Sequence, residues 1–129
     1  MAFLRLARAS DGVPVENVTG AERLGGIASL RSPSLVQVIG YPDGAAQPVL
    51  CVNWIKTFSA TQLEFDCGGF TNGTSGGPFL ADVSAGSGQG TIIGVIGGYE
   101  QGGDTPDVSY ASVLGTSVTE LYRAAEAGG

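Results

Sequence analysis

The 129-residue sequence contains no histidine, a single lysine (Lys56) and no apolar run of the roughly 20 residues that a membrane span needs. Without histidine, the chain lacks the commonest general base, and its two cysteines alone cannot form a usual structural zinc site. Its net charge of −6 argues against nucleic-acid and membrane partners. The carboxylates are scattered along the chain, so we expect neither a metal nor a cofactor.

The two cysteines, Cys51 and Cys67, fall on neighbouring predicted strands, residues 48–57 and 62–67. A disulfide between them is the favoured interpretation and indicates an oxidising compartment, whereas two buried thiols in a cytosolic protein are the alternative. We therefore expect a secreted or extracytoplasmic protein. Residues 1–9 are too short, and too weakly apolar, to act as a signal peptide.

Twenty-two glycines, six prolines and runs rich in Val and Ile predict an all-β fold. The whole chain, 1–129, is expected to form one domain: a strand within 1–8, a surface connector over 9–33, and the main sheet with a C-terminal helix over 34–129. A capping box of Ser117 and Glu120 is expected to begin that helix, which ends at Gly128. The other expected strands cover residues 34–42, 48–57, 62–67, 78–83, 91–99 and 108–113.

The most informative motif is Gly-Thr-Ser-Gly-Gly-Pro at residues 73–78. Its glycines allow backbone angles that other residues resist, and Pro78 fixes φ where the next strand begins. Such a turn presents the Ser75 hydroxyl beside backbone N–H groups. Acyl transfer needs both parts, a nucleophile and donors for the developing oxyanion. The alternative is an ordinary glycine-rich hairpin loop.

These six residues resemble the nucleophile motif of trypsin-like (chymotrypsin-fold) serine peptidases. Thr74 stands where Asp is commonest, a position at which bacterial members vary. The likeness covers nearly the whole chain and implies the second barrel of that fold, a six-stranded antiparallel Greek-key β-barrel with a short C-terminal helix. It further implies that Ser75 is the nucleophile and that the backbone N–H groups of Gly73 and Ser75 form the oxyanion hole.

The same resemblance implies that peptides and proteins are the substrates. The approach to Ser75 forms one wall of the specificity pocket, and Gly69 stands where trypsin-type enzymes carry Asp. This wall therefore gives no support for a preference for Arg or Lys. Residues 97–99 fall where substrate backbone pairs with the enzyme. The substrate-binding residues implied in this way are Gly69, Phe70, Gly97, Gly98, Tyr99 and Ser109.

The family draws its catalytic His and Asp from a first barrel, which this sequence does not contain. Residues 1–6 resemble the stretch that directly follows the catalytic Asp, so the chain is interpreted as the second half of such a peptidase. We expect negligible peptidase activity from these 129 residues alone and a first-barrel partner in the full protein. The face left uncovered is expected to be partly apolar and to favour a homo-oligomer.

Two other interpretations fit parts of the sequence. Gly73 to Gly77 also matches the Gly-x-Ser-x-Gly elbow of α/β-hydrolases, but that elbow needs a helix after it, and here Pro78 and an apolar strand follow. The second is a non-catalytic β-barrel that binds peptides or proteins along residues 97–99, with Ser75 as a vestige.

Overall fold

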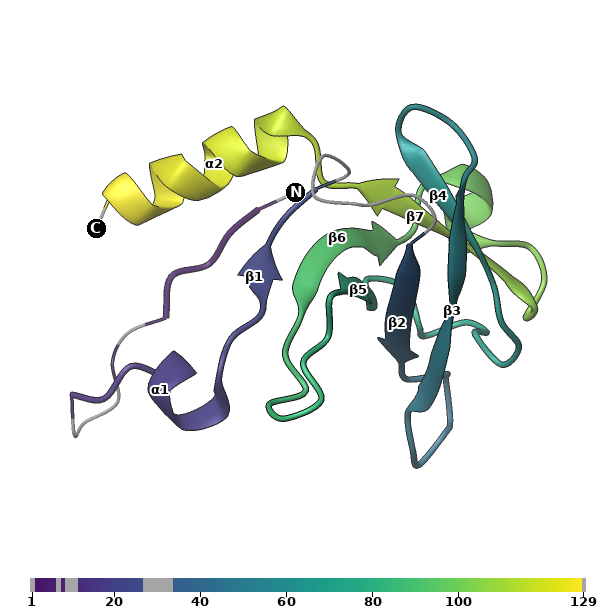
Figure 1. Ribbon diagram of the computed structural model, residues 1–129, viewed down its shortest axis with the longest axis horizontal. Coiled ribbons are helices and arrows are strands. Elements are labelled where there is room, and N and C mark those ends of the chain that lie inside the picture. The colour runs from purple at the N-terminus through teal and green to yellow at the C-terminus, as the bar shows by residue number, and fades with distance from the viewer. Residues whose placement is uncertain (1, 7, 9–11, 27–33, 129) are drawn as a thin grey trace.

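The computed structural model describes residues 2–6, 8, 12–26 and 34–128 (Figure 1). In space the strands follow the order β1-β6-β5-β2-β3-β4-β7, and β7 pairs with β6 as well. The elements, in chain order, are α1 (Glu16–Thr19), β1 (Arg23–Leu24), β2 (Leu35–Gly40), β3 (Val49–Thr57), β4 (Gln62–Asp66), β5 (Pro78–Ala81), β6 (Thr91–Ile96), the 3-10 helix η2 (Tyr99–Gly102), β7 (Val108–Val113) and α2 (Thr116–Ala127).

The pairing of β6 with β7 closes strands β2 to β7 into a six-stranded barrel in which every neighbouring pair is antiparallel. Strands β2, β3 and β4 follow one another as a meander, and β5 then returns to pair with the far side of β2. This is the Greek-key order. The predicted fold class, an all-β Greek-key barrel with a C-terminal helix, is confirmed.

The barrel core is made by alternating apolar residues whose side chains point inward. Val36 and Val38 of β2 are fully buried, as are Leu63 and Phe65 of β4. The ring of Phe65 lies 5.4 Å from that of Phe79 and 6.1 Å from that of Phe70, both in edge-to-face contact. Phe70 therefore connects the centre of the core with the segment that leads to Ser75.

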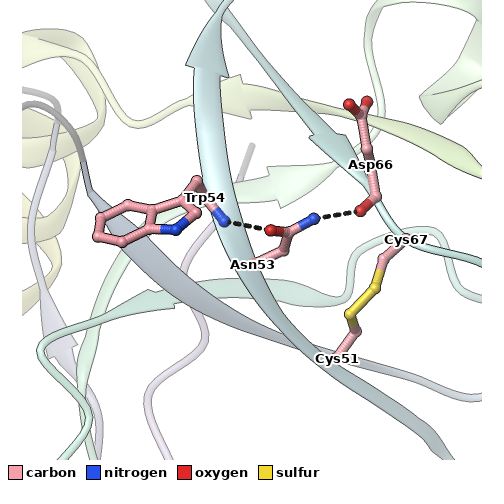
Figure 2. The surroundings of a disulfide bond; sticks show 5 residues. All are labelled: Cys51, Asn53, Trp54, Asp66 and Cys67. Carbon is pink, nitrogen blue, oxygen red and sulfur yellow. Dashed lines mark hydrogen bonds between the residues drawn. A yellow bond between two sulfur atoms is a disulfide. The ribbon is translucent and has the colours of Figure 1, made fainter.

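Cys51 and Cys67 form a disulfide that joins β3 to the residue after β4, with Cα atoms 6.5 Å apart (Figure 2). The Asn53 side chain strengthens the same junction: its amide donates to the Asp66 carbonyl oxygen at 2.7 Å, and its oxygen accepts from the Trp54 N–H at 2.8 Å. The predicted pairing of the two cysteines is confirmed. It fixes the start of residues 68–72, the approach to Ser75.

The N-terminal part differs from the prediction. Residues 2–6 and 8, the described part of the stretch expected as a strand, are not in a strand. Leu4 and Leu6 are 88% and 67% exposed, because no strand of the described residues pairs with this apolar alternation. The segment instead runs near α2, where the ring of Phe3 meets that of Tyr122 at 5.4 Å (Figure 1).

The expected connector, residues 9–33, contains regular structure that the sequence pattern did not reveal. It includes α1 and the two-residue strand β1, which pairs in parallel with β6 through Arg23 and Thr91. The Arg23 side chain also donates to the Thr91 hydroxyl at 3.2 Å. Residues 9–11 and 27–33 of this connector lie outside the described residues.

The C-terminal helix α2 is present and is followed by Gly128, as predicted. The capping box is wrong: α2 begins at Thr116, its N-cap is Gly115, and no side chain caps it. Because the helix starts two residues earlier than a Ser117 N-cap requires, Ser117 lies inside its first turn. No helix in the described ranges combines the length and apolar character required to span a bilayer.

Candidate active site

Ser75 lies on an exposed turn between the approach segment and β5. Gly73 and Gly76 on either side of it have φ of 94° and 81°, the left-handed region that favours glycine. The Gly76 N–H donates to the Ile96 carbonyl oxygen at 2.9 Å, and the Ile96 N–H donates to that of Gly77 at the same distance. These two hydrogen bonds attach the turn to the end of β6.

Thr74 anchors the turn on its buried side. Its side chain is only 3% exposed, and its hydroxyl donates to the Thr71 carbonyl oxygen at 2.8 Å. It packs so closely on Gly40 of β2 that a Cβ placed there would lie 2.8 Å from the Thr74 Cβ. The hydroxyl of the buried Thr74 is therefore hydrogen-bonded within the turn, and the next residue, Ser75, is exposed.

The groups around the Ser75 hydroxyl are free to meet a ligand. Among the described residues, neither the Gly73 nor the Ser75 backbone N–H donates a hydrogen bond, and none is made by the Ser75 hydroxyl. The neighbouring N–H groups of Thr74, Gly76 and Gly77 are all engaged within the protein. Two unpaired backbone donors beside an exposed hydroxyl are what an oxyanion site requires.

A cavity of about 410 Å³ adjoins Ser75. We define its first wall as the lining residues of the approach and the turn, and its second wall as residues 101–106, which comprise the end of η2 and the loop that leads to β7. Asp43, from the loop after β2, and Ile96 complete the lining. The lining residues are Asp43, Phe70, Thr71, Asn72, Thr74, Ser75, Ile96, Gln101, Gly102, Gly103, Asp104, Thr105 and Pro106.

The second wall begins in strained backbone. Glu100 and Gln101 have φ of 47° and 57°, and Gly102 and Gly103 continue with φ of 111° and 132°. Residues with a Cβ resist this region, and such strain persists only where the surrounding structure imposes it. Sequence reasoning assigned these residues to a loop and missed their place at the cavity. The glycine pairs at 97–98 and 102–103 were the signal for an unusual backbone.

The substrate-binding residues predicted from the sequence are not all at this cavity. Phe70 lines it, whereas Gly69, which has φ of 91°, is exposed and precedes it. Ser109 is 1% exposed within β7 and does not appear in the lining drawn from the described residues. The predicted role of Gly69 and Ser109 in binding substrate stays a prediction.

Residues 97–99 are also outside the cavity lining drawn from the described residues. The Gly97 N–H donates to the Tyr110 carbonyl oxygen at 3.0 Å, and the Tyr99 N–H donates to the Gln62 side-chain oxygen at 3.3 Å. Gly98, with φ of 90°, packs so tightly that a Cβ there would lie 2.5 Å from the Ser112 hydroxyl oxygen. A substrate strand that paired with the Tyr99 N–H would displace Gln62.

Three aromatic rings meet at the surface next to this stretch. Phe58, Tyr99 and Tyr110 come from three separate parts of the chain, and their centroids lie 4.8 to 4.9 Å apart. A hydrogen bond to the Glu100 carboxylate raises the pKa of Tyr99, and desolvation raises that of Tyr110. Both phenols therefore stay neutral at physiological pH, and neither is a base for Ser75.

Lys56 is not a base for Ser75 either. Its ammonium forms ion pairs with Asp66 at 2.5 Å and with Glu64 at 3.0 Å on the outer face of β3 and β4. Hydrogen bonds to Asp66 and then to Glu64 raise its pKa, which keeps it protonated. It does not line the Ser75 cavity. Among the described residues, no group of three or more His, Cys, Asp or Glu is arranged to hold a metal ion.

Comparison with solved structures found a similarity in fold. The chain is similar to a solved structure described as a thermostable serine protease from an extremophilic microorganism, with a TM-score of 0.67 and 18% sequence identity. The match covers 95% of this chain and 56% of the protease, so the chain spans about half the length of that protein. No family model and no curated protein matches the chain. At this identity the likeness shows the fold, that of a chymotrypsin-like protease barrel.

Proposed function

We propose that this chain is the second barrel of a trypsin-like serine endopeptidase, with Ser75 as its nucleophile. One observation carries the proposal. The exposed Ser75 hydroxyl lies beside two backbone N–H groups that have no partner among the described residues, on a turn attached to β6 and bordering a cavity of about 410 Å³. The fold likeness to a serine protease over 95% of the chain supports it.

In this function Ser75 Oγ attacks the carbonyl carbon of a peptide bond. A bond forms between the two atoms, and the carbonyl electron pair moves to the oxygen, where the Gly73 and Ser75 N–H groups stabilise it. A base accepts the hydroxyl proton and returns it to the leaving amine as the C–N bond breaks. The acyl group then remains on Ser75 until water removes it.

The base comes from outside these 129 residues in this proposal, because the sequence has no histidine and the Lys56 ammonium forms ion pairs with Glu64 and Asp66. A first barrel that carries His and Asp would supply it. The matched protease is nearly twice as long as its aligned part, which leaves room for such a barrel. An unassisted serine hydroxyl is a weak nucleophile, so the isolated chain has negligible peptidase activity.

Two further features support the setting of this function. The Cys51–Cys67 disulfide fits an oxidising, extracytoplasmic compartment. The outer face of β2 and β3 carries large exposed apolar side chains, which a first barrel or a second copy of the chain would cover. These side chains are Leu35, Leu50, Val52 and Trp54, and Leu35 is paired directly with Trp54.

The proposal can be tested by supplying the base from solution. The full chain is incubated with p-nitrophenyl acetate and imidazole, and acylated serines are identified by peptide mapping with mass spectrometry. We expect Ser75 to be acylated at least about tenfold faster than Ser87, an exposed loop serine, because one oxyanion donor alone changes rates by about a hundredfold or more. Ser75→Ala is the control for signal at other sites.

Equal acylation of Ser75 and Ser87 would instead favour the non-catalytic binding barrel. A second measurement addresses the missing base. Steady hydrolysis of peptides by the purified chain without imidazole, abolished by Ser75→Ala, would show that the chain holds a base of its own and would overturn that part of the proposal.

A further inference from the structure

We propose that Asn72, on the first wall of the cavity, is a site of self-modification. The backbone nitrogen of Gly73 attacks the Asn72 side-chain amide, ammonia leaves, and the residue becomes aspartate or isoaspartate. The reaction itself does not depend on the proposed function of Ser75. Its consequence for acyl transfer does rest on that function, because Gly73 supplies one of the two proposed oxyanion donors.

The sequence contains three asparagines, and the surroundings of Asn72 differ from those of the other two. Attack on a side-chain amide needs an accessible amide and a following backbone nitrogen that no hydrogen bond holds. Asn72 is exposed, and among the described residues its side chain makes no hydrogen bond and the Gly73 N–H donates none. Glycine also places no Cβ beside the attacking nitrogen.

At the other two asparagines the following N–H is engaged. Asn17 is exposed, but the Val18 N–H donates to the Val15 carbonyl oxygen at 2.9 Å in α1. Asn53 is half-buried, and its side-chain oxygen accepts the Trp54 N–H at 2.8 Å (Figure 2). Of the three, which all lie in the described part of the chain, Asn72 alone combines an exposed amide with an unpaired nitrogen.

A hydrogen bond to the peptide group between Asn72 and Gly73 also favours the reaction. The carbonyl oxygen of this group accepts the Asp43 N–H at 2.7 Å. A hydrogen bond to a peptide oxygen draws electron density away from the attached nitrogen, so the Gly73 N–H becomes a better acid. Loss of that proton is the step that makes the peptide nitrogen a nucleophile.

The reaction needs no reagent other than water. Hydroxide removes the Gly73 N–H proton, the nitrogen forms a bond to Asn72 Cγ, and the bond from Cγ to the side-chain nitrogen breaks. That nitrogen takes a proton from water and leaves as ammonia, and a cyclic succinimide joins the two residues. Water then opens the ring. Opening at Cγ gives aspartate, whereas opening at the main-chain carbonyl carbon gives isoaspartate, in which the chain continues through Cβ and Cγ.

Both products change the turn that carries Ser75. Aspartate adds a negative charge to the lining of the cavity. Isoaspartate lengthens the backbone before Gly73 and removes from the chain the carbonyl that accepts the Asp43 N–H. Gly73 is closely packed, since a Cβ there would lie 2.8 Å from the Tyr41 carbonyl oxygen. The longer backbone therefore displaces the Gly73 N–H, and acylation of Ser75 should slow.

The test follows the purified full chain during incubation in mildly alkaline buffer. Peptide mapping with mass spectrometry measures loss of amide at each asparagine, and protein isoaspartyl methyltransferase labels isoaspartate. We expect Asn72 to be half converted before any loss is detectable at Asn17 or Asn53. The folded chain should convert Asn72 within about threefold of its rate in guanidinium chloride, because no native hydrogen bond has to break first. Slowing by more than about tenfold on folding would overturn the inference.

Val18→Gly is the matched control, because it creates a second Asn-Gly pair at a position where the following N–H is donated to the Val15 carbonyl oxygen. Val18 is 76% exposed, so the change removes little packing. Asn17 in this variant should convert at least about threefold more slowly than Asn72, which reflects the net strength of one hydrogen bond. Equal conversion at the two sites would overturn the inference, because the residue pair alone would then set the rate.

The consequence for Ser75 is measured on the same incubated chain. The isoaspartate form, separated by chromatography, should be acylated at Ser75 at least about tenfold more slowly than the fresh chain, because one oxyanion donor is displaced. Asn72→Gln, whose longer side chain closes a ring far more slowly, should retain its own initial rate after the same incubation. Undiminished acylation of the isoaspartate form would overturn this consequence. If the fresh chain shows no preference for Ser75, the proposed function fails, while conversion of Asn72 measured by mass still stands.

Discussion

The two walls of the Ser75 cavity are held in place in different ways. The first wall follows the Cys51–Cys67 disulfide, contains the buried Thr74 and is attached to β6 by hydrogen bonds of 2.9 Å. The second wall starts within η2, where Gln101 and the preceding Glu100 have left-handed backbone. The difference indicates that the two walls differ in support: Ser75, the proposed nucleophile, lies on the wall held by the disulfide and by hydrogen bonds to β6, whereas the shape of the other wall depends on strained loop backbone.

The largest effect is expected from breaking the first wall with Gly73→Ala. Its φ of 94° is unfavourable for alanine, and the new Cβ would lie 2.6 Å from the Asp43 nitrogen and 2.8 Å from the Tyr41 carbonyl oxygen. We expect the free energy of unfolding to fall by roughly 3–4 kcal/mol, as strain and overpacking combine. Urea denaturation measures it, and acylation of Ser75 should be lost as well.

Gly76→Ala is the matched control for that change. Gly76 has a similar φ of 81°, but a Cβ there would meet nothing within 4 Å. Only the backbone strain remains, so the loss should be about 1–2 kcal/mol. If the two variants lose the same stability, close packing under the turn does not hold the first wall.

A smaller effect is expected from removing the disulfide with Cys51→Ala and Cys67→Ala together. The bond closes a loop with a sequence separation of 16, worth about 3 kcal/mol on the chain-entropy model. Because Cys67 directly precedes the approach to Ser75, hydrogen exchange at the Gly76 and Gly77 amides should accelerate more than at Gly103. Equal acceleration on both walls would contradict the view that the disulfide anchors the first wall in particular.

The smallest effect is expected in the second wall, from Gln101→Gly. Glycine removes the conformational cost of a φ of 57°, about 1–2 kcal/mol, but costs about 0.5–1 kcal/mol in chain entropy on folding, so the free energy of unfolding should rise by up to about 1.5 kcal/mol. Gln47→Gly, at an exposed loop residue without positive φ, should instead destabilise the protein. Thermal denaturation measures the stability of both variants against the unsubstituted chain. A loss of stability in Gln101→Gly would show that the backbone of the second wall is not strained.

Much of the barrel could be predicted from local pattern. Leu63 and Phe65 alternate with Glu64, which is enough to place β4 and its inward face. The expected strand at residues 108–113 has the same bounds as β7. The turn at Ser75 could be predicted from the sequence because its backbone conformation favours glycine and proline. The disulfide could be predicted because the two cysteines fall on neighbouring predicted strands.

The features that were missed depend on partners distant in the sequence. Leu4 and Leu6 alternate as a strand would, but within the described ranges no strand pairs with them, so alternation alone gave the wrong answer. Strand β1 has two residues, too few for a periodic pattern in the sequence. It forms because its backbone pairs with β6. The Ser117 capping box failed because the helix started at Thr116.

The sequence by itself determined the chemistry that this chain brings: a serine on a glycine-rich turn, two cysteines able to pair, and no histidine to act as base. These follow from residue identity and from local backbone preference. Only the tertiary structure decided that Asp43 and Asp104 share a cavity with Ser75. Their loops border one cavity because β5 pairs with both β2 and β6, and β6 pairs with β7. Such long-range pairing depends on how the whole barrel closes rather than on any local pattern.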